Sequence, residues 1–129
     1  MYEDSVSEES MLAKKVWAVV GATQNPQKYG YKLYRKLKNR GYTVYPVNPV
    51  YPDIDGDVCF PKLSSLPQVP EVINMVISPK KGSEILEEAA KLGVKNIWFQ
   101  PGTYDDELIA LCNKLEIDYV LGCVLISLG

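Results

Sequence analysis

Val16-Trp17-Ala18-Val19-Val20-Gly21-Ala22-Thr23 is the stretch that decides the fold. Its first five residues are apolar without alternation and largely β-branched, which is typical of a strand buried on both faces of a parallel sheet. A polar loop, Thr23–Gln27, follows the glycine. The stretch therefore predicts a strand and a loop, and the next apolar residues recur at helical spacing: Gly30, Leu33, Tyr34 and Leu37.

The same order of elements recurs further along the chain. A second strand is predicted at Tyr42–Val47, and later ones at Val72–Ile77, Asn96–Phe99 and Tyr119–Ile126. Ser78 and Pro79 fit the N-cap and first residue of the helix after the third strand. Residues 48–71 are rich in proline and predict a long irregular connection, with at most a short extra strand or a turn of helix.

Strands that alternate with helices form βαβ units, whose strands are parallel and whose helices cover both faces of the sheet. We therefore predict an α/β protein with a Rossmann-like, doubly wound, five-stranded parallel sheet in three α/β/α layers. The expected strand order is 3-2-1-4-5, with the switch point between the first and fourth strands. Ligands of such sheets bind outside the carboxyl ends of the strands there, which here are residues 21–23 and 100–102.

Length and composition fit a single globular domain. The chain has 129 residues, 47% apolar and 23% charged, and it contains no run of about 18 apolar residues that would span a membrane. Residues 1–15 read as a polar lead-in with a short helix over Ser7–Lys14, and residues 16–129 as the domain. The acidic start, without an early basic residue, argues against a secretory signal.

Histidine is absent, and the three cysteines have no CxxC spacing. Without histidine, Ser-His-Asp and Cys-His catalysis and the usual zinc sites are excluded. We therefore expect no metal site, and we expect a binding protein rather than an enzyme. An odd number of cysteines indicates reduced thiols in the cytoplasm.

Charge is unevenly distributed along the chain. Residues 10–52 contain eight basic residues and no acidic one, which predicts a positive field on the first third of the protein. A pI near 5.2 argues against binding of nucleic acid, so a small polyanion is the better interpretation. The loop after the first strand leads into a helix N-terminus, where a phosphate is favoured. Lys28, Lys32 and Arg35 lie along one flank of that helix.

The loop lacks the glycine pattern of a dinucleotide site. G-x-G-x-x-G would be expected there, but the sequence reads Gly21-Ala22-Thr23-Gln24-Asn25-Pro26. The ribose position after the second strand holds Val47-Asn48-Pro49, without a carboxylate. NAD(P) is therefore disfavoured, although an NAD(P)-binding redox domain remains an alternative. No P-loop motif is present.

Several motifs together resemble a known family. They are Val19-Val20-Gly21-Ala22-Thr23-x-Asn25-Pro26, Gly41-Tyr42-x-Val44-x-Pro46-Val47-Asn48-Pro49, Ile77-Ser78-Pro79 and Trp98-x-Gln100-x-Gly102. In this order they resemble the small stand-alone CoA-binding domain proteins, whose fold is similar to the CoA-binding domain of the succinyl-CoA synthetase α subunit. The resemblance covers about residues 16–123.

This resemblance implies that the crevice binds coenzyme A or an acyl-CoA. Gly21, Ala22 and Thr23 would meet the phosphates and Lys32 would add charge, while the adenosine end would be bordered by Val47, Asn48 and Pro49. The pocket would be completed by Ser78, Pro79, Gln100 and Gly102. We expect a non-catalytic carrier or sensor whose partner is a small nucleotide cofactor, with no nucleic acid or membrane partner. Self-association stays open, as does an interaction subunit with a vestigial crevice.

Overall fold

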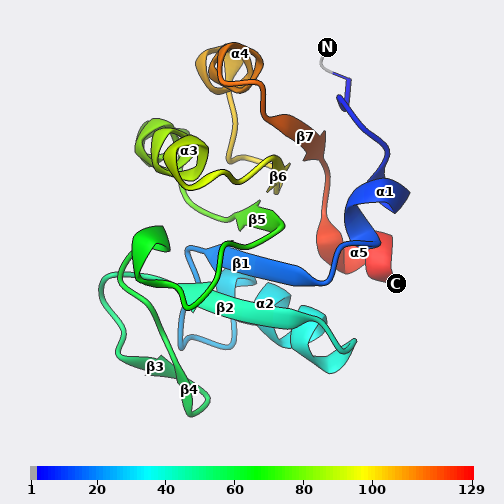
Figure 1. The fold of residues 1–129 in the computed structure, drawn as a ribbon. Helices are drawn as coiled ribbons and strands as arrows, with labels where there is room; N and C mark the ends of the chain where they lie inside the picture. The colour runs from blue at the N-terminus through cyan, green and yellow to red at the C-terminus, as the bar shows by residue number, and fades with distance from the viewer. Residues whose placement is uncertain (1–2) are drawn as a thin grey trace.

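A parallel sheet forms the middle layer of the protein in the computed structural model, which describes residues 3–129. Its five strands are β2 (Thr43–Val47), β1 (Val16–Val20), β5 (Val72–Met75), β6 (Asn96–Phe99) and β7 (Asp118–Leu121), in that order across the sheet. Helices cover both faces, as Figure 1 shows. One face carries α3 (Pro79–Leu92) and α4 (Asp106–Lys114), and the other carries α1 (Glu8–Leu12), α2 (Tyr29–Asn39) and α5 (Val124–Leu128). The predicted three-layer α/β fold is confirmed.

The predicted strand order, 3-2-1-4-5, is wrong, because the third strand β5 pairs with β1 and the observed order is 2-1-3-4-5. Pro46 in β2 supplies a physical reason. The carbonyl of Val47 accepts a hydrogen bond from Gly21 N (3.0 Å), so the backbone of Pro46 faces the opposite, outer edge. Proline has no N–H to donate there and suits an edge strand. The switch point therefore lies between β1 and β5.

The last predicted strand is also corrected. β7 ends at Leu121, and the residues from Val124 onward form α5 instead of continuing the strand. A continuous apolar run does not by itself distinguish a strand from a buried helix. The predicted start of α3 agrees with the structure, since Ser78 is its N-cap and Pro79 its first residue, whereas β5 ends at Met75, two residues before the predicted end. The irregular connection contains β3 (Asp53–Ile54), β4 (Asp57–Val58) and the 3₁₀ helix η1 (Leu63–Ser65).

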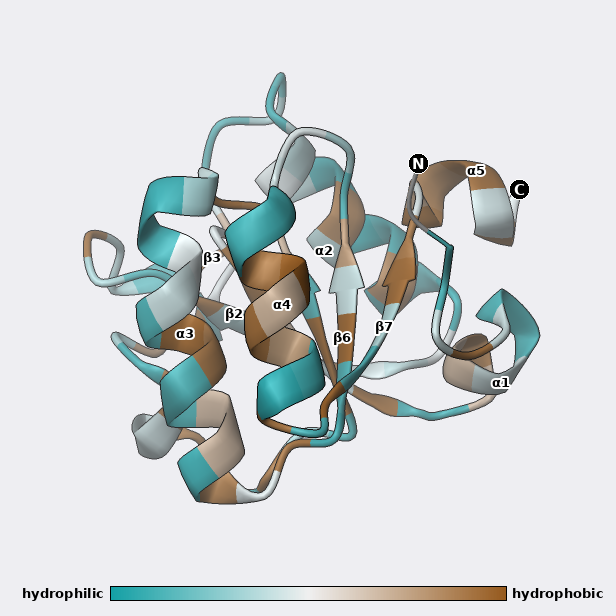
Figure 2. Ribbon diagram, turned by 90° about the horizontal axis from the view of Figure 1, so that it is seen from above, coloured by the Kyte–Doolittle hydropathy of each residue, from teal (hydrophilic) through white to brown (hydrophobic). Residues whose placement is uncertain are grey.

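Two apolar cores lie on the two faces of the sheet. The core under α3 and α4 is separate from the core under α1, α2 and α5, which includes the fully buried Trp17 and Trp98. Figure 2 shows alternating apolar and polar bands along α3 and α4, as expected of helices that bury one side. The helical stripe of α2 is buried as predicted. Within residues 3–129, no helix has the length and apolar character needed to cross a bilayer.

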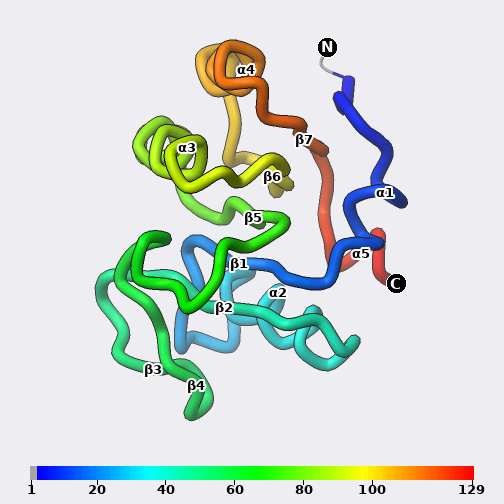
Figure 3. Tube along the Cα trace, in the orientation of Figure 1, coloured from blue at the N-terminus to red at the C-terminus, as the bar shows by residue number. Residues whose placement is uncertain are grey.

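Both edge strands of the sheet have hydrogen-bond partners on their outer side. At β2, Phe60 N donates to Pro46 O (2.9 Å). At β7, Ser5 N donates to Tyr119 O (3.0 Å), and Tyr119 N donates to Ser5 Oγ (2.7 Å). The polar N-terminal segment therefore lies along β7 and continues into α1 beside α5, a path that Figure 3 traces.

Acidic residues of the β3–β4 hairpin pair with basic residues of α2. Arg35 forms an ion pair with Asp55 (3.6 Å), and Lys38 forms one with Asp57. The hydroxyl of Tyr34 also donates to Asp57. The hydrogen bond from Lys38, followed by that from Tyr34, lowers the pKa of the Asp57 carboxyl below its ordinary value. The positive field of this helix is consequently weaker on its hairpin side than the sequence alone predicts.

Asp57→Asn should destabilise the protein more at neutral pH than in acid. Because the folded state lowers the pKa of Asp57, its carboxylate stabilises the fold above the ordinary carboxyl pKa, and this contribution is lost as the pH falls through the folded pKa. The pair is partly exposed, so we expect a loss of at most about 1 kcal/mol at pH 7. Denaturant unfolding at pH 7 and at about pH 3 measures it. Exposed Glu87→Gln is the control, and an equal loss from Asp57→Asn at both pH values would contradict the prediction.

Candidate functional site

The loop between β1 and α2 is built around two glycines. Gly21 ends β1 with φ +102°, and a Cβ there would lie 2.7 Å from the carbonyl oxygen of Val76. Gly30 lies in the first turn of α2, and a Cβ there would lie 2.1 Å from the carbonyl oxygen of Gly21. Only glycine allows this close approach. The close contact of Gly30 with Gly21 points the N-terminus of α2 towards the carboxyl end of β1. Free N–H groups and the helix dipole at such an N-terminus favour binding of an anion.

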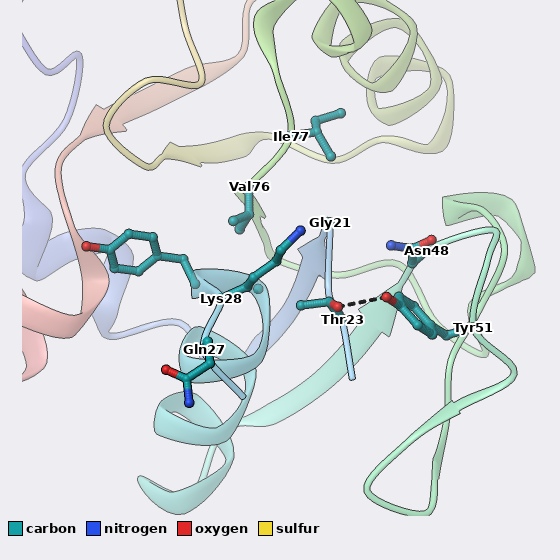
Figure 4. A pocket seen from close by; sticks show the side chains of 10 residues that line it. Gly21, Thr23, Gln27, Lys28, Asn48, Tyr51, Val76 and Ile77 are labelled. Atoms are coloured by element: carbon teal, nitrogen blue, oxygen red, sulfur yellow. Dashed lines mark hydrogen bonds between the residues drawn. The ribbon is translucent and has the colours of Figure 1, made fainter. Parts of the chain in front are cut away.

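Side chains from the loop after β2 hold the β1–α2 loop in place. Thr23 Oγ1 donates to the hydroxyl oxygen of Tyr51 (2.9 Å) and accepts from Asn25 N (3.2 Å). Asn48 Nδ2 donates to Ala22 O (2.9 Å). Figure 4 shows the Thr23–Tyr51 bond beside the cavity, with Asn48 facing it. The hydroxyls and amide of these residues are therefore ordered around the end of β1.

The first cavity lies at this loop and has a volume of about 550 Å³. Its lining includes Gly21, Thr23, Lys28, Asn48, Tyr51 and Ile77. Figure 4 shows the Lys28 ammonium directed towards Gly21 and Val76, whereas Gln27 points away. The other cations of α2 and its C-cap lie elsewhere: Arg35 and Lys38 pair with the hairpin, Lys36 and the C-cap Arg40 are bonded to Gly129 O, and Lys32 lies over the Tyr29 ring. Lys28 and the helix N-terminus thus supply the positive potential of this cavity.

Two further cavities extend the first one along the carboxyl ends of the strands. One, of about 510 Å³, lies beyond β2 and shares Gly21, Asn48 and Ile77 with the first. The other, of about 400 Å³, lies at the ends of β5 and β6 and shares Tyr29, Val76 and Ile77 with it. Each volume is of the size that small ligands occupy in proteins. The three cavities together form an elongated crevice.

Most of the predicted site residues lie along this crevice. Gly21, Thr23 and Asn48 line the first cavity, Val47 and Pro49 the second, and Ser78, Gln100 and Gly102 the third. The remaining three lie elsewhere. Ala22 is buried beneath the loop, Pro79 lines a separate groove between α3 and α4, and Lys32 is exposed with its ammonium 5.9 Å from the centroid of the Tyr29 ring.

Gln100 is buried and links three elements by hydrogen bonds. Its Oε1 accepts hydrogen bonds from Asn74 Nδ2 (3.3 Å) and from Val124 N (3.0 Å). These contacts join β5, the end of β6 and the start of α5. Gln100 therefore fixes α5 beside the third cavity, and its oxygen is committed to the protein interior.

The structure also brings residues outside the predicted site set to the crevice. Val76 and Ile77 follow β5 and face the β1–α2 loop, a position that the wrong strand order had assigned to residues after β6. Tyr51 is brought in by its hydrogen bond to Thr23, which links residues far apart in the sequence. The Pro46 signal would have placed β2 at the edge and so identified Val76 and Ile77.

The three cysteines are all unpaired. Burial raises the pKa of the Cys112 thiol to about 12 and also raises that of Cys59. Neither thiol is therefore ionised near neutral pH. Cys123, which is half-buried, lines the third cavity.

The family of the chain follows from the comparison with known proteins. The family described as CoA binding domain matches residues 15–129, nearly the whole chain. The chain belongs to the CoA-binding domain family. The resemblance seen in the sequence is thereby confirmed.

Curated relatives contain this CoA-binding domain as a small part of longer proteins. The chain is 32% identical over 87 residues to an ADP-forming acetate–CoA ligase I of Archaeoglobus fulgidus, covering 67% of this chain and 13% of the ligase. It is 31% identical over 81 residues to the α subunit of an ADP-forming acetate–CoA ligase II of Pyrococcus furiosus, covering 62% of this chain and 18% of that subunit. The chain thus spans less than a fifth of the length of these two relatives.

Solved structures of similar size also match this chain. A conserved hypothetical protein from Pyrococcus furiosus has a TM-score of 0.83 and 36% identity, covering 89% of this chain and 99% of that one. A hypothetical protein from Pyrococcus horikoshii has a TM-score of 0.87 and 30% identity, covering 98% of this chain and 95% of that one. The fold therefore also occurs as a protein of one domain.

Proposed function

We propose that this protein binds coenzyme A or an acyl-CoA in the three-cavity crevice, as a non-catalytic carrier or sensor. The observation that carries the proposal is the joint occurrence of the family match over residues 15–129 and a cavity of about 550 Å³ at the β1–α2 loop, lined by Lys28 and the start of α2. Three unpaired cysteines suit a cytoplasmic protein.

The pyrophosphate of CoA would lie in the first cavity. Backbone N–H groups at the start of α2 are available donors, and so is the hydroxyl of Tyr51, which accepts from Thr23 and keeps its own hydrogen; Lys28 provides the charge. Gly21 lets the ligand approach the backbone closely because it has no side chain. This combination of donors, dipole and charge is what a diphosphate requires.

The two ends of the ligand would extend into the flanking cavities. The adenosine would lie beyond β2, against Asn48 and Pro49. The pantetheine arm would cross Val76 and Ile77, whose aliphatic side chains suit its methylene groups, and reach the third cavity. Cys123 and Ile126 line that end, so an acyl group carried on the sulfur of CoA would meet a largely apolar wall.

CoA fits the second cavity better than NAD does. A dinucleotide site holds a carboxylate at the end of the second strand, where it binds the ribose hydroxyls. This protein has Asn48 at that position, and its side chain is committed to Ala22 O and Val50 N. An amide does not repel the ribose phosphate of CoA.

Thermal unfolding in the presence of CoA, acetyl-CoA, NADH and NADPH tests this function. A ligand at about 100 times its Kd stabilises the folded state by about 2.7 kcal/mol, a rise in Tm of roughly 8–15 °C for a domain of this size. We expect that rise with CoA or acetyl-CoA and not with the dinucleotides. A rise with NADH or NADPH alone would favour a redox domain. The absence of any rise would favour an interaction subunit with a vestigial crevice.

A further inference from the structure

The cavity beyond β2 contains two lysines that the family resemblance does not assign. It lies between the carboxyl end of β2 and the first turns of α3, and it opens into the first cavity through Gly21, Asn48 and Ile77. Lys62 enters it from the residue before η1, and Lys81 from the first turn of α3. Two distant segments of the chain thus deliver a cation to one cavity.

Both lysines are free to bind an anion. Ion pairs within 4.0 Å involve Arg35 and Lys38 in the part of the chain that the structure describes, and neither Lys62 nor Lys81 takes part in one there. Glu84 also lines the cavity, one turn after Lys81, so the side chains of this cavity carry two positive charges and one negative charge. The first turn of α3 contains no acidic residue, and its N-terminal dipole adds to the positive potential.

The position of this cavity relates it to the ribose of a bound nucleotide. In doubly wound sheets the group at the carboxyl end of the second strand meets the ribose, with a carboxylate for hydroxyls and a cation for a ribose phosphate. Here that end carries Asn48 and Pro49, and Lys62 and Lys81 line the same cavity. Lysine is well suited to bind a phosphate as a point charge.

We propose that Lys62 and Lys81 bind the 3′-phosphate of the CoA ribose and make the protein discriminate CoA from 3′-dephospho-CoA. The inference rests on the proposed function, because it requires that the adenosine end lies in this cavity. It assigns the lysines a different task from Lys28, which serves the pyrophosphate.

Dissociation constants for CoA and for 3′-dephospho-CoA, measured by calorimetry, test the proposal. We expect the unmodified protein to bind CoA about tenfold more tightly than 3′-dephospho-CoA. Lys62→Ala and Lys81→Ala should each weaken CoA binding about threefold, the effect of a partly exposed charge contact of about 0.7 kcal/mol. Both should leave 3′-dephospho-CoA binding within about twofold, so that the preference disappears in the double variant.

Two further variants sharpen the test. Lys80→Ala is the matched control, since Lys80 is the neighbour of Lys81 but lines the separate groove between α3 and α4. It should leave both constants unchanged. Glu84→Gln removes the negative charge of the cavity and should strengthen CoA binding about twofold without affecting 3′-dephospho-CoA. Each variant is at an exposed position, and an unchanged Tm confirms that it folds.

The outcomes separate this inference from the proposed function. Equal affinity of the unmodified protein for the two ligands, or equal weakening of both by Lys62→Ala and Lys81→Ala, would overturn the 3′-phosphate site while leaving CoA binding intact. Failure of both ligands to bind would overturn the proposed function and the inference with it. A preference for CoA in the unmodified protein that only the lysine variants lose would support both the 3′-phosphate site and the proposed function.

Discussion

Gly30→Ala is expected to reduce both the stability of the protein and its affinity for CoA. The added Cβ would lie 2.1 Å from the carbonyl oxygen of Gly21, so α2 and the β1–α2 loop must move apart. Forcing an extra carbon into a packed contact costs roughly 1–3 kcal/mol. If the displaced loop loses a hydrogen bond to a phosphate, worth about 1.5–3 kcal/mol, CoA binds roughly 10–100-fold more weakly. Denaturant unfolding and calorimetric titration with CoA measure the two effects.

Gly82→Ala provides the matched control for this experiment. Gly82 also lies inside a helix, but a Cβ there would meet the flexible end of Leu108 at 2.7 Å instead of backbone atoms. We expect a smaller change in stability and no change in the Kd for CoA. The role assigned to the Gly21–Gly30 contact would be refuted by a Gly30→Ala protein that binds CoA as tightly as the unmodified one.

Lys28→Ala should weaken CoA binding about tenfold at low salt, because it removes a charge-assisted contact to the pyrophosphate. The weakening should be accompanied by a smaller salt dependence of the Kd, since one fewer ionic contact is screened. Titration with CoA at two salt concentrations measures both quantities.

Lys32→Ala changes the charge of the same helix by the same amount, one turn further along. Lys32 lies outside the crevice over the Tyr29 ring, so at 0.15 M salt, where screening acts within about 8 Å, we expect at most a twofold effect. Equal effects of the two substitutions would mean that the helix acts through its general field, and that the charge role suggested for Lys32 by the family resemblance holds instead.

Most of the fold could be predicted from the sequence because each of its parts has a local signature. The continuous apolar run Val16–Val20 and the stripe of α2 are set by burial, which a single segment reveals. Strand order depends on contacts between segments far apart in the sequence. One local sign of it is Pro46, which lacks an N–H and therefore favours an edge position for β2. The helix of Val124–Leu128 was missed because an apolar run this short fits either element.

The site could be predicted only in part, for a related reason. The β1–α2 loop has its own signal in Gly21 and the following helix start, and the structure places it at the first cavity. Tyr51, Lys62 and Lys81 reach the crevice through tertiary packing, which no spacing in the sequence records. The positive field of the first third is overestimated from the sequence. The segment without acidic residues predicts a positive field, but Asp55 and Asp57, which follow it in the sequence, pair with basic residues of α2.

The outer hydrogen bonds of β2 and β7 have a consequence for the behaviour of the protein at high concentration. Unpaired backbone groups on an edge strand are a template on which another chain can add a strand and begin to aggregate. Here Pro46 offers no donor and its carbonyl accepts from Phe60 N, while the N–H and the carbonyl of Tyr119 are both hydrogen-bonded to Ser5. Growth of the sheet from one molecule into the next is therefore hindered at both ends.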